Sequence, residues 1–379
     1  MKKNFRSSEV MSKLLSDFLV DLPSPSSLSY MWNFGSLLGM FLLFQIITGL
    51  FLSIHFSVDV ELSFSSVIHI MRDVNWGWMI RVFHSNGASM FFMMMYFHIG
   101  RGIYYGSYRL EKTWMSGVTI FLLAMATAFL GYVLPWGQMS FWAATVITNL
   151  MSAIPYVGVM MVEWVWGGYA VSNPTLTRFF AFHFIFPFVI MFLVIVHLIF
   201  LHEVGSSNPL GISSSMDKIS FHFLFNVKDV YGVFLAMFML ILLSMLMPFV
   251  FMDCENFIPS NPLVTPVHIQ PEWYFLYAYS ILRSVASKIG GVVALLMSVF
   301  VLYLFPLVMK HKIQSLSFYV FGKVLYWYLV VVWIMLMWLG SCEVESPYGE
   351  IGGVMSFLYF LLFVLMWMGC KIQDMMEWF

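Results

Sequence analysis

Two apolar segments decide the fold: FHSNGASMFFMMMYFHIG at residues 83–100 and FHFIFPFVIMFLVIVHLI at residues 182–199. Each contains two histidines separated by fourteen residues. Fourteen residues of an α-helix leave an angular offset of roughly 40° and a rise of ~21 Å. Each pair is therefore expected on one stripe of its helix, with its members near opposite surfaces of a ~30 Å hydrocarbon layer. The histidines are His84 and His98 in the first segment, and His183 and His197 in the second.

Two pairs of glycines repeat the same interval: Gly35 and Gly49, then Gly117 and Gly131. Glycine removes the side chain and lets another group approach the backbone closely. Packing of small residues between membrane helices is the simpler interpretation of either pair alone. The interval shared with the histidines favours a role of the glycines in the same site.

The composition indicates a polytopic membrane protein. The chain is 61% hydrophobic and 10% charged, whereas soluble domains carry about 25% charged residues. Its net charge of −1 and the absence of a long basic run argue against a nucleic-acid partner. The three cysteines form no C-x-x-C motif and give no metal signature.

Eight apolar runs are long enough to cross a bilayer, which takes ~20 residues. The longest stretches between them, 135–176 and 252–290, are expected to be irregular and to lie on the same side, opposite the N-terminus. We expect an all-α fold with eight transmembrane helices, the first four forming a four-helix bundle. The predicted spans are 32–55, 77–104, 114–134, 177–201, 229–251, 291–309, 322–340 and 351–369.

The Lys and Arg residues set the orientation. With the two termini and the connections after the second, fourth and sixth spans on one side, that side holds thirteen of the eighteen basic residues. Basic residues are enriched in the loops on the cytoplasmic side of membrane proteins. We call this the inner side, and it corresponds to the matrix if the protein is mitochondrial.

Histidines inside membrane spans are functional candidates, because an ionisable side chain is costly there. A hydrogen bond to a neighbouring carbonyl is the plain alternative, but it does not explain two pairs at one interval. Zinc would need a cluster of ligands, and these histidines are far apart along each helix. Two facing helices would place two imidazoles on each of two haem irons, leaving no open site for oxygen and favouring transfer of single electrons.

Three arginines are candidate partners for anionic haem propionates. Arg81 and Arg101 stand three residues from His84 and His98, and Arg178 opens the fourth span. Charge-assisted hydrogen bonds from guanidinium groups suit carboxylates. The alternative is that each is an interfacial arginine with its head group in the lipid headgroup region.

These residues closely resemble the mitochondrial cytochrome b family, the core subunit of ubiquinol–cytochrome c reductase (respiratory complex III). The resemblance covers essentially the whole chain. The matching segments, besides the histidines and glycines, are PEWY at 271–274, GRGIYYGSY at 100–108, GYVLPWGQMSFW at 131–142, TNL at 148–150, NPLG at 208–211 and ILRS at 281–284.

The resemblance implies a quinol-oxidising site on the outer side, near the haem of His84 and His183. Glu272 matches the family's proton acceptor there. From the residues alone, Glu272 lies in an apolar stretch where desolvation would raise its pKa towards the range of a general base; a solvated loop glutamate is the alternative. Phe129, Tyr132 and Tyr279 match the family's pocket-lining residues.

The resemblance also implies a quinone-reducing site on the inner side, near the haem of His98 and His197. A quinone that becomes quinol takes up two protons, so a histidine and an aspartate reached from water suit proton delivery. The Lys228-Asp229 pair also fits an ordinary charged helix start. The matching residues are His202, Asp229, Lys228, Ser36 and Ser206.

Two departures from the family pattern stand near the outer site. Ala143 replaces the usual glycine, and its methyl group is expected to intrude on the quinol pocket and to weaken strobilurin-type inhibitors. Ala286-Ser287 replaces the usual Pro-Asn or Pro-Asp pair, so the loop before the sixth span is expected to be less rigid.

The activity implied by the resemblance is a Q cycle. Quinol, of the ubiquinol type, is oxidised outside and quinone is reduced inside through two b haems, with proton translocation. The implied partners are a Rieske iron–sulfur protein, cytochrome c1 and other complex III subunits in a homodimeric complex. The implied location is the mitochondrial inner membrane with both termini in the matrix, and the implied domains are a dihaem domain, 1–211, and a C-terminal domain, 212–379.

Two other functions remain open at this point. A dihaem reductase that feeds an outside acceptor would have no second quinone site and would tolerate Glu272→Gln. A proton-relaying transporter would favour broken helices and inverted repeats; Pro187 interrupts one span, but no repeat is evident in the sequence.

Overall fold

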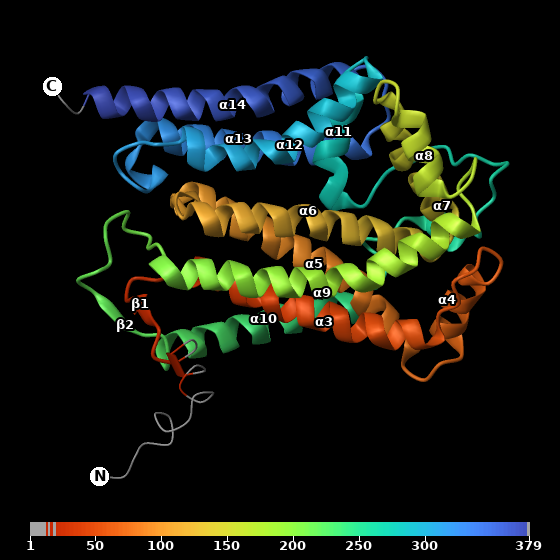
Figure 1. The fold of residues 1–379 in the computed structure, drawn as a ribbon, viewed down its shortest axis with the longest axis horizontal. Coiled ribbons are helices and arrows are strands. Elements are labelled where there is room, and N and C mark those ends of the chain that lie inside the picture. The colour runs from red at the N-terminus through yellow and green to blue at the C-terminus, as the bar shows by residue number, and fades with distance from the viewer. Residues whose placement is uncertain (1–12, 14–15, 18–19, 377–379) are drawn as a thin grey trace, which may run out of the picture.

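A computed structural model of the protein describes residues 13, 16–17 and 20–376. Eight long helices run side by side along the longest axis of the molecule (Figure 1). Each has at least 21 residues, which is about 31 Å of helix and enough to cross a bilayer. They are α3 (Phe34–His55), α5 (Gly77–Tyr104), α6 (Glu111–Val133), α9 (Asn173–Val204), α10 (Leu224–Leu246), α12 (Lys288–Val308), α13 (Val320–Ser341) and α14 (Tyr348–Met376).

Seven of these helices are both long and apolar enough to span a membrane. The eighth, α5, has 28 residues but carries several polar side chains. Those side chains face the protein: Asn86 is 0% exposed and Ser89 is 1% exposed. Since α5 hides its polar groups among other helices, its lower hydropathy fits a central membrane helix, and the all-α fold expected from the sequence is confirmed.

One predicted span is displaced by several residues. The run 229–251 was expected to cross, but α10 covers Leu224–Leu246. Pro248 follows directly, and a residue before proline is disfavoured in the helical conformation. Met247 accordingly leaves the helix, with φ −140° and ψ 60°. The apolar pattern alone does not reveal where this helix ends.

The two stretches expected to be irregular contain short helices, so that prediction was wrong. Their apolar runs are too short to resemble a span, yet four of these helices bury some of their residues; in α11 the buried residues include Tyr277 and Ile281. The helices are α7 (Gln138–Asn149), η3 (Leu150–Ala153), α8 (Gly158–Trp166), η4 (Cys254–Phe257), η5 (Trp273–Phe275) and α11 (Leu276–Ser284).

The two stretches do lie at the same end of the bundle, as expected. Gly137 and Pro259 form an isolated antiparallel bridge, and the Gln138 side chain donates to the Val264 carbonyl at 3.0 Å. Helices α4 (Ser63–Arg72), α7 and α8 all lie at this end, at the right of Figure 1. We call this the outer end.

The opposite, inner end carries both chain termini of the described part and a small sheet (Figure 1). Strand β1 (Pro23–Pro25) pairs antiparallel with β2 (Lys218–Ser220), a pairing that the sequence did not indicate. The remaining short helices are η1 (Tyr30–Trp32), which precedes α3, and η2 (Ser107–Arg109) and η6 (Leu316–Phe318), which connect long helices.

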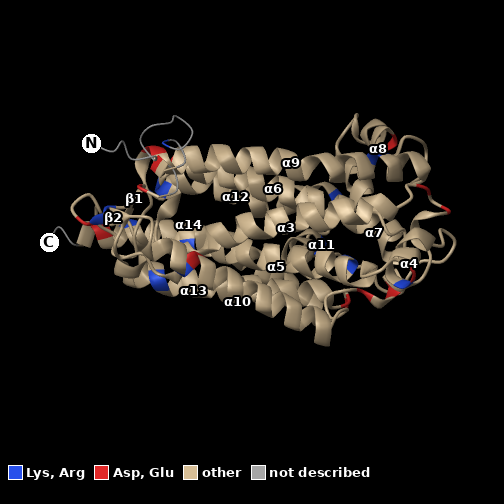
Figure 2. Ribbon diagram, turned by 90° about the horizontal axis from the view of Figure 1, so that it is seen from below, with Lys and Arg blue, Asp and Glu red and all other residues tan. Residues whose placement is uncertain are grey.

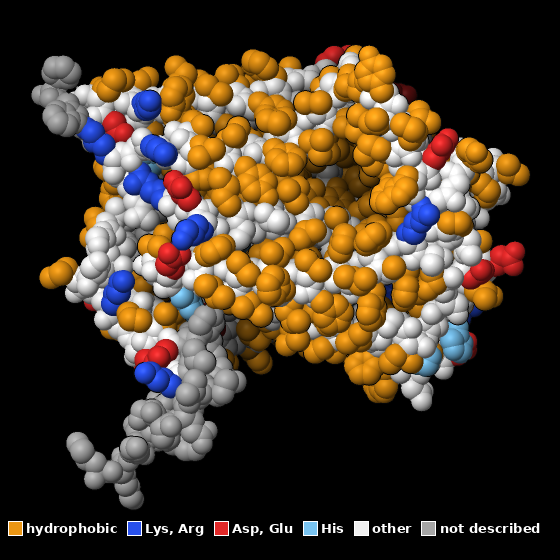
Figure 3. Space-filling view, in the orientation of Figure 1, with side chains coloured by type: hydrophobic (Ala, Val, Ile, Leu, Met, Phe, Trp, Pro, Cys, Tyr) orange, Lys and Arg blue, Asp and Glu red, His pale blue; other side chains and the backbone are white. Residues whose placement is uncertain are grey.

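The surface fits a membrane between these two ends. Lys, Arg, Asp and Glu gather at the ends of the bundle in Figure 2, whereas the middle is nearly free of them. The face shown in Figure 3 has a broad band of hydrophobic side chains between the charged ends. The protein is therefore a multi-pass membrane protein.

The bundle core consists of two closely packed helix pairs, α3 with α5 and α6 with α9. Helix α10 packs against α3 and α5, while α11 packs among α12, α13 and α14. Thus α10, although placed after residue 211, covers the first bundle. The domain boundary between 211 and 212 stays a prediction.

Candidate functional site: two facing imidazole pairs

The four histidines lie on two helices and form two facing pairs. His84 on α5 faces His183 on α9, with ring centroids 6.2 Å apart and planes at 84°. His98 faces His197, with centroids 6.4 Å apart and planes at 56°. A metal–imidazole bond of about 2 Å on each side gives a centroid separation of about 6 Å. Both pairs therefore fit one metal ion between two imidazoles.

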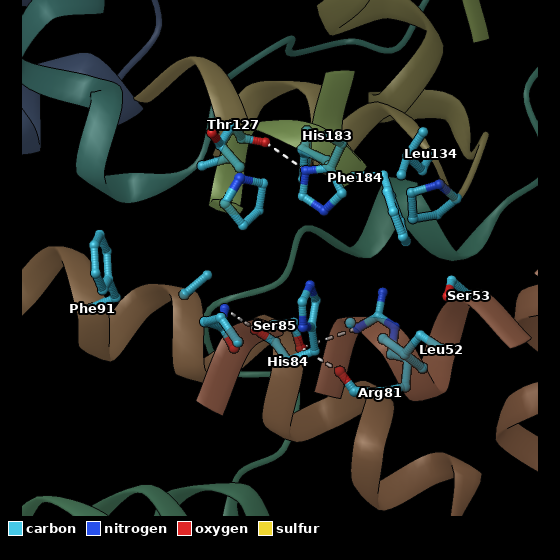
Figure 4. A pocket seen from close by; sticks show the side chains of 18 of the residues that line it. Leu52, Ser53, Arg81, His84, Ser85, Phe91, Thr127, Leu134, His183 and Phe184 are labelled. Atoms are coloured by element: carbon cyan, nitrogen blue, oxygen red, sulfur yellow. Dashed lines mark hydrogen bonds between the residues drawn. The ribbon is translucent and has the colours of Figure 1, made fainter. Parts of the chain in front are cut away.

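Hydrogen bonds fix the tautomer of the outer pair. The His183 Nδ1 lies 2.8 Å from the Thr127 carbonyl, which only accepts, so this Nδ1 carries the proton (Figure 4). The Thr48 hydroxyl donates to the Phe44 carbonyl at 2.8 Å and so accepts from the His84 Nδ1 at 2.9 Å. Each Nε2 then keeps a lone pair for a metal, as second-sphere hydrogen bonds commonly ensure.

The inner pair has one matching anchor. The Ser116 hydroxyl donates to the Thr113 carbonyl at 2.9 Å and accepts from the His197 Nδ1 at 2.9 Å. The Arg101 guanidinium lies 3.3 Å from the His98 Nδ1. The same guanidinium stacks over the Trp32 ring, 5.1 Å from its centroid.

We expect Thr48→Val to change the outer pair alone and Ser116→Ala to change the inner pair alone. Each variant removes the acceptor of one Nδ1–H, which makes that imidazole a poorer donor and lowers metal-group affinity by about 10- to 100-fold. A redox titration that follows the absorbance of the metal group expected at each pair measures this. Each variant should raise the midpoint potential at one pair; unchanged potentials in both variants would contradict the assigned anchors.

The four glycines each face one of the four imidazoles. A Cβ at Gly35 would lie 3.4 Å from His98 Cε1, an ordinary contact, and one at Gly49 would lie 3.1 Å from His84 Cε1. At Gly117 the distance to His197 Cε1 would be 3.0 Å, and at Gly131 the Cβ would overlap His183. The glycines thus make room for the ligand rings, and their role in binding a cofactor stays a prediction.

The outer pair opens into a cavity of about 280 Å³. His84 and His183 point into it from opposite walls, with Arg81 beside them (Figure 4). Gly49, Gly131, Tyr132 and Glu272 also line it, among mostly apolar side chains. A flat apolar group that receives one imidazole on each face suits this cavity.

Glu272 brings a carboxyl group to the same cavity. It lies just before η5, outside the long helices. Burial raises its pKa from 4.5 to about 8; the nearby Arg81 charge lowers it and Asp253 raises it further. The direction agrees with the expectation from the sequence, because the apolar surroundings disfavour the charged carboxylate.

Comparison with known proteins decides the family. Residues 19–205 match the family described as "Cytochrome b/b6/petB", and residues 259–360 match "Cytochrome b(C-terminal)/b6/petD". The chain belongs to the cytochrome b/b6 family. A solved structure titled "Hyperthermophilic respiratory Complex III" is similar to it, with a TM-score of 0.91 and 29% identity over 97% of this chain and 98% of that chain.

Membership of the cytochrome b/b6 family implies binding of haem b, and the facing imidazoles suit its iron. The predicted propionate partners are distributed unequally. Arg81 lines the outer cavity and donates to Met252 Sδ at 2.9 Å. Arg101 lies beside His98. Arg178 is exposed and donates to the Trp164 and Val165 carbonyls at the end of α8, and it does not line this cavity.

Three residues that the sequence predicted to line a quinol pocket lie outside the cavity of the outer pair. Phe129 packs edge-on against Phe179, with centroids 6.0 Å apart. Ala143 is buried on α7, at 4% exposed. The Tyr279 hydroxyl donates to the Ile269 carbonyl at 2.9 Å. Their assignment to the pocket stays a prediction.

At the inner end, the structure brings two of the predicted quinone-site residues together. The Ser36 hydroxyl on α3 donates to Asp229 Oδ1 on α10 at 2.7 Å. Lys228 donates to the Leu28 carbonyl at 2.9 Å. His202 lies near the end of α9, and Ser206 follows in the loop after it. The proton-delivery role of these residues is untested.

Sequence reasoning missed the hydroxyl anchors of the imidazoles. A signal was present: Thr48 directly precedes Gly49, and Ser116 directly precedes Gly117. A hydroxyl beside a ring-facing glycine is well placed to meet the Nδ1 of that ring. The Thr127 carbonyl carried no such signal, since every residue has a carbonyl.

Proposed function

We propose that this chain is the membrane electron-transfer subunit of a quinol–cytochrome c oxidoreductase, holding two b haems. His84 and His183 hold the outer haem, and His98 and His197 hold the inner one. The observation that carries the proposal is the pair of imidazole–imidazole gaps of 6.2 and 6.4 Å. The similarity to a respiratory complex III supports it.

A haem held between two imidazoles would supply one-electron transfer. The chain's part is to hold the imidazoles of His84, His197 and His183 in their ligand tautomer. Thr48, Ser116 and the Thr127 carbonyl do this. Arg81 and Arg101 place positive charge beside the two sites and are the proposed propionate partners, together with Arg178.

At the outer site, Glu272 accepts a proton from the bound quinol. A carboxyl with a pKa of about 8 matches a proton acceptor that works near neutral pH. The apolar walls exclude water, and the proposed pocket extends to Phe129, Tyr132, Ala143 and Tyr279. One electron of the quinol leaves to an iron–sulfur partner and the other crosses the membrane between the two sites.

At the inner site, quinone is reduced by two electrons, one from each of two quinols oxidised at the outer site, and takes up two protons. Asp229, held by Ser36, and His202 deliver them from the inner surface, with Lys228 and Ser206 beside the ring. Because protons are released outside and taken up inside, the cycle translocates charge. We propose ubiquinone, or a related quinone, as the substrate.

The net reaction requires partner subunits. The sequence lacks the cysteine set of an iron–sulfur centre and the C-x-x-C-H motif of a c-type haem. We propose a Rieske iron–sulfur protein and cytochrome c1 as partners, within a homodimeric complex of the mitochondrial inner membrane. The excess of basic residues on one side supports a topology in which both termini lie in the matrix.

An optical redox titration of the purified complex tests the proposal. Two b-type bands with different potentials are expected, and quinol should reduce cytochrome c through the complex. A single band, or none, would contradict the two-haem assignment. Two bands without quinol oxidation would instead support a reductase that feeds another acceptor. Extraction and identification of the copurified quinone names the substrate.

We expect Ala143→Gly to increase sensitivity to strobilurin-type inhibitors while leaving quinol turnover unchanged. Removing the buried methyl group enlarges the proposed pocket without touching a haem ligand. Inhibitor titration of the two forms of the complex measures the effect. Equal inhibition of both forms would show that Ala143 does not shape the pocket.

A further inference from the structure

Helix α5 carries a second stripe, turned roughly 130° from its two histidines. It consists of Ser89, Phe92 and Tyr96, spaced three and four residues apart and located between His84 and His98. Ser89 and Phe92 are each 1% exposed. None of the three serves a role in the site described above.

All three residues of this stripe contact the segment that follows Glu272. The Trp273 indole Nε1 donates to the Ser89 hydroxyl at 3.1 Å. The Tyr274 ring stacks on Phe92, with centroids 4.2 Å apart and planes at 5°. The Tyr96 hydroxyl donates to the Tyr274 carbonyl.

These contacts differ in kind, but together they fix the position of the segment after Glu272 relative to α5. The stacked ring fixes the segment's distance from α5, and two hydrogen bonds fix its position along the helix. Tyr274 is 4% exposed, so its carbonyl has little access to water and depends on Tyr96. Loss of a partner from a buried carbonyl costs about 1–3 kcal/mol.

The Glu272 carboxyl itself has no described hydrogen-bond partner; it is located by its own backbone, directly before Trp273. The same helix holds His84, and Glu272 and His84 line one cavity. A rigid helix that holds both groups fixes their separation.

We propose that Ser89, Phe92 and Tyr96 are positioning residues that set the Glu272 carboxyl relative to the outer imidazole pair. Helix α5 thus carries the imidazole of His84 and, through these three residues, also positions the Glu272 carboxyl. This inference rests on the proposed function, because Glu272 is taken as the acceptor of the quinol proton.

The first test compares Tyr96→Phe with Tyr359→Phe in the purified complex. Tyr359 is a matched control: its hydroxyl donates to the Ser298 carbonyl at 2.8 Å, so a buried bond of the same kind is lost at a residue that packs on Tyr277 rather than on Trp273 or Tyr274. Haem content from the b-type bands shows that each variant assembles. The readouts are kcat and KM for quinol and the pH dependence of kcat.

Tyr96→Phe should lower kcat by about 10- to 100-fold, the range expected for a small misplacement of a reacting group, with little change in KM. The midpoint of the pH profile should move from about 8 towards the ordinary glutamate value, since a loosened carboxyl can turn to water. Tyr359→Phe should keep the wild-type midpoint. If the two variants share one profile, Tyr96 has only a structural role.

A double-mutant cycle of Ser89→Ala and Trp273→Phe supplies the second test. If the bond between them positions Glu272, each single variant shifts the pH midpoint and the double variant shifts it no further. Additive shifts would overturn the proposed coupling. A wild-type complex with no quinol oxidation would contradict the proposed function itself. Wild-type turnover together with variants whose pH midpoint does not shift would contradict only this inference.

Discussion

Changing Gly131 to alanine should abolish the proposed outer haem site and leave the proposed inner one intact. A Cβ at this position overlaps His183 Cε1 and lies 2.8 and 2.9 Å from its two ring nitrogens. The ring cannot swing away without breaking its bond to the Thr127 carbonyl. We expect one of the two b-type bands to disappear, as measured by the reduced-minus-oxidised spectrum and by haem content per chain.

Gly35→Ala is the matched control, with the same change at the equivalent position of another imidazole. Its Cβ would lie 3.4 Å from His98 Cε1, which is van der Waals contact. This variant should retain both bands, and Gly117→Ala, at 3.0 Å, should show an intermediate effect on the inner band. Equal haem loss at Gly35 and Gly131 would show that the fit of the rings does not decide binding.

Glu272→Gln should lower quinol oxidation by about 100-fold or more at pH 8, the usual contribution of a general base. A base must be ionised, and the Glu272 pKa is raised to about 8 by burial. Below that value the ionised fraction falls about tenfold per pH unit. Wild-type kcat should therefore rise up to about pH 8 and then level, while the variant profile should be flat. Stopped-flow reduction of the outer b-type band measures this.

Glu255→Gln is a fitting control, because Glu255 belongs to the same outer-end stretch but does not line the cavity. It should keep the wild-type profile. Asp253→Asn removes a charge that raises the Glu272 pKa, so its midpoint should move to lower pH. A Glu272→Gln enzyme with an unchanged pH profile would remove Glu272 from the proton path and would favour the simpler dihaem reductase.

The sequence by itself determined the class of fold and the presence of two histidines on one stripe of each of two helices. Composition and apolar runs predicted the membrane helices, and the fourteen-residue interval predicted two histidines per stripe. These features are local to one helix, since rise and rotation per residue are fixed by backbone hydrogen bonding. The helix stop before Pro248 and the short helices of the outer end were missed, because apolarity over 20 residues does not register them.

Only the tertiary structure decided which groups meet between helices. It placed each glycine against an imidazole, set Thr48 and Ser116 at the ring nitrogens, left Arg178 outside the outer cavity, and laid the Glu272 segment on the second stripe of α5. Such contacts depend on the rotation and axial shift of one helix relative to another. Packing of the whole bundle sets both, so no single segment of the sequence contains them.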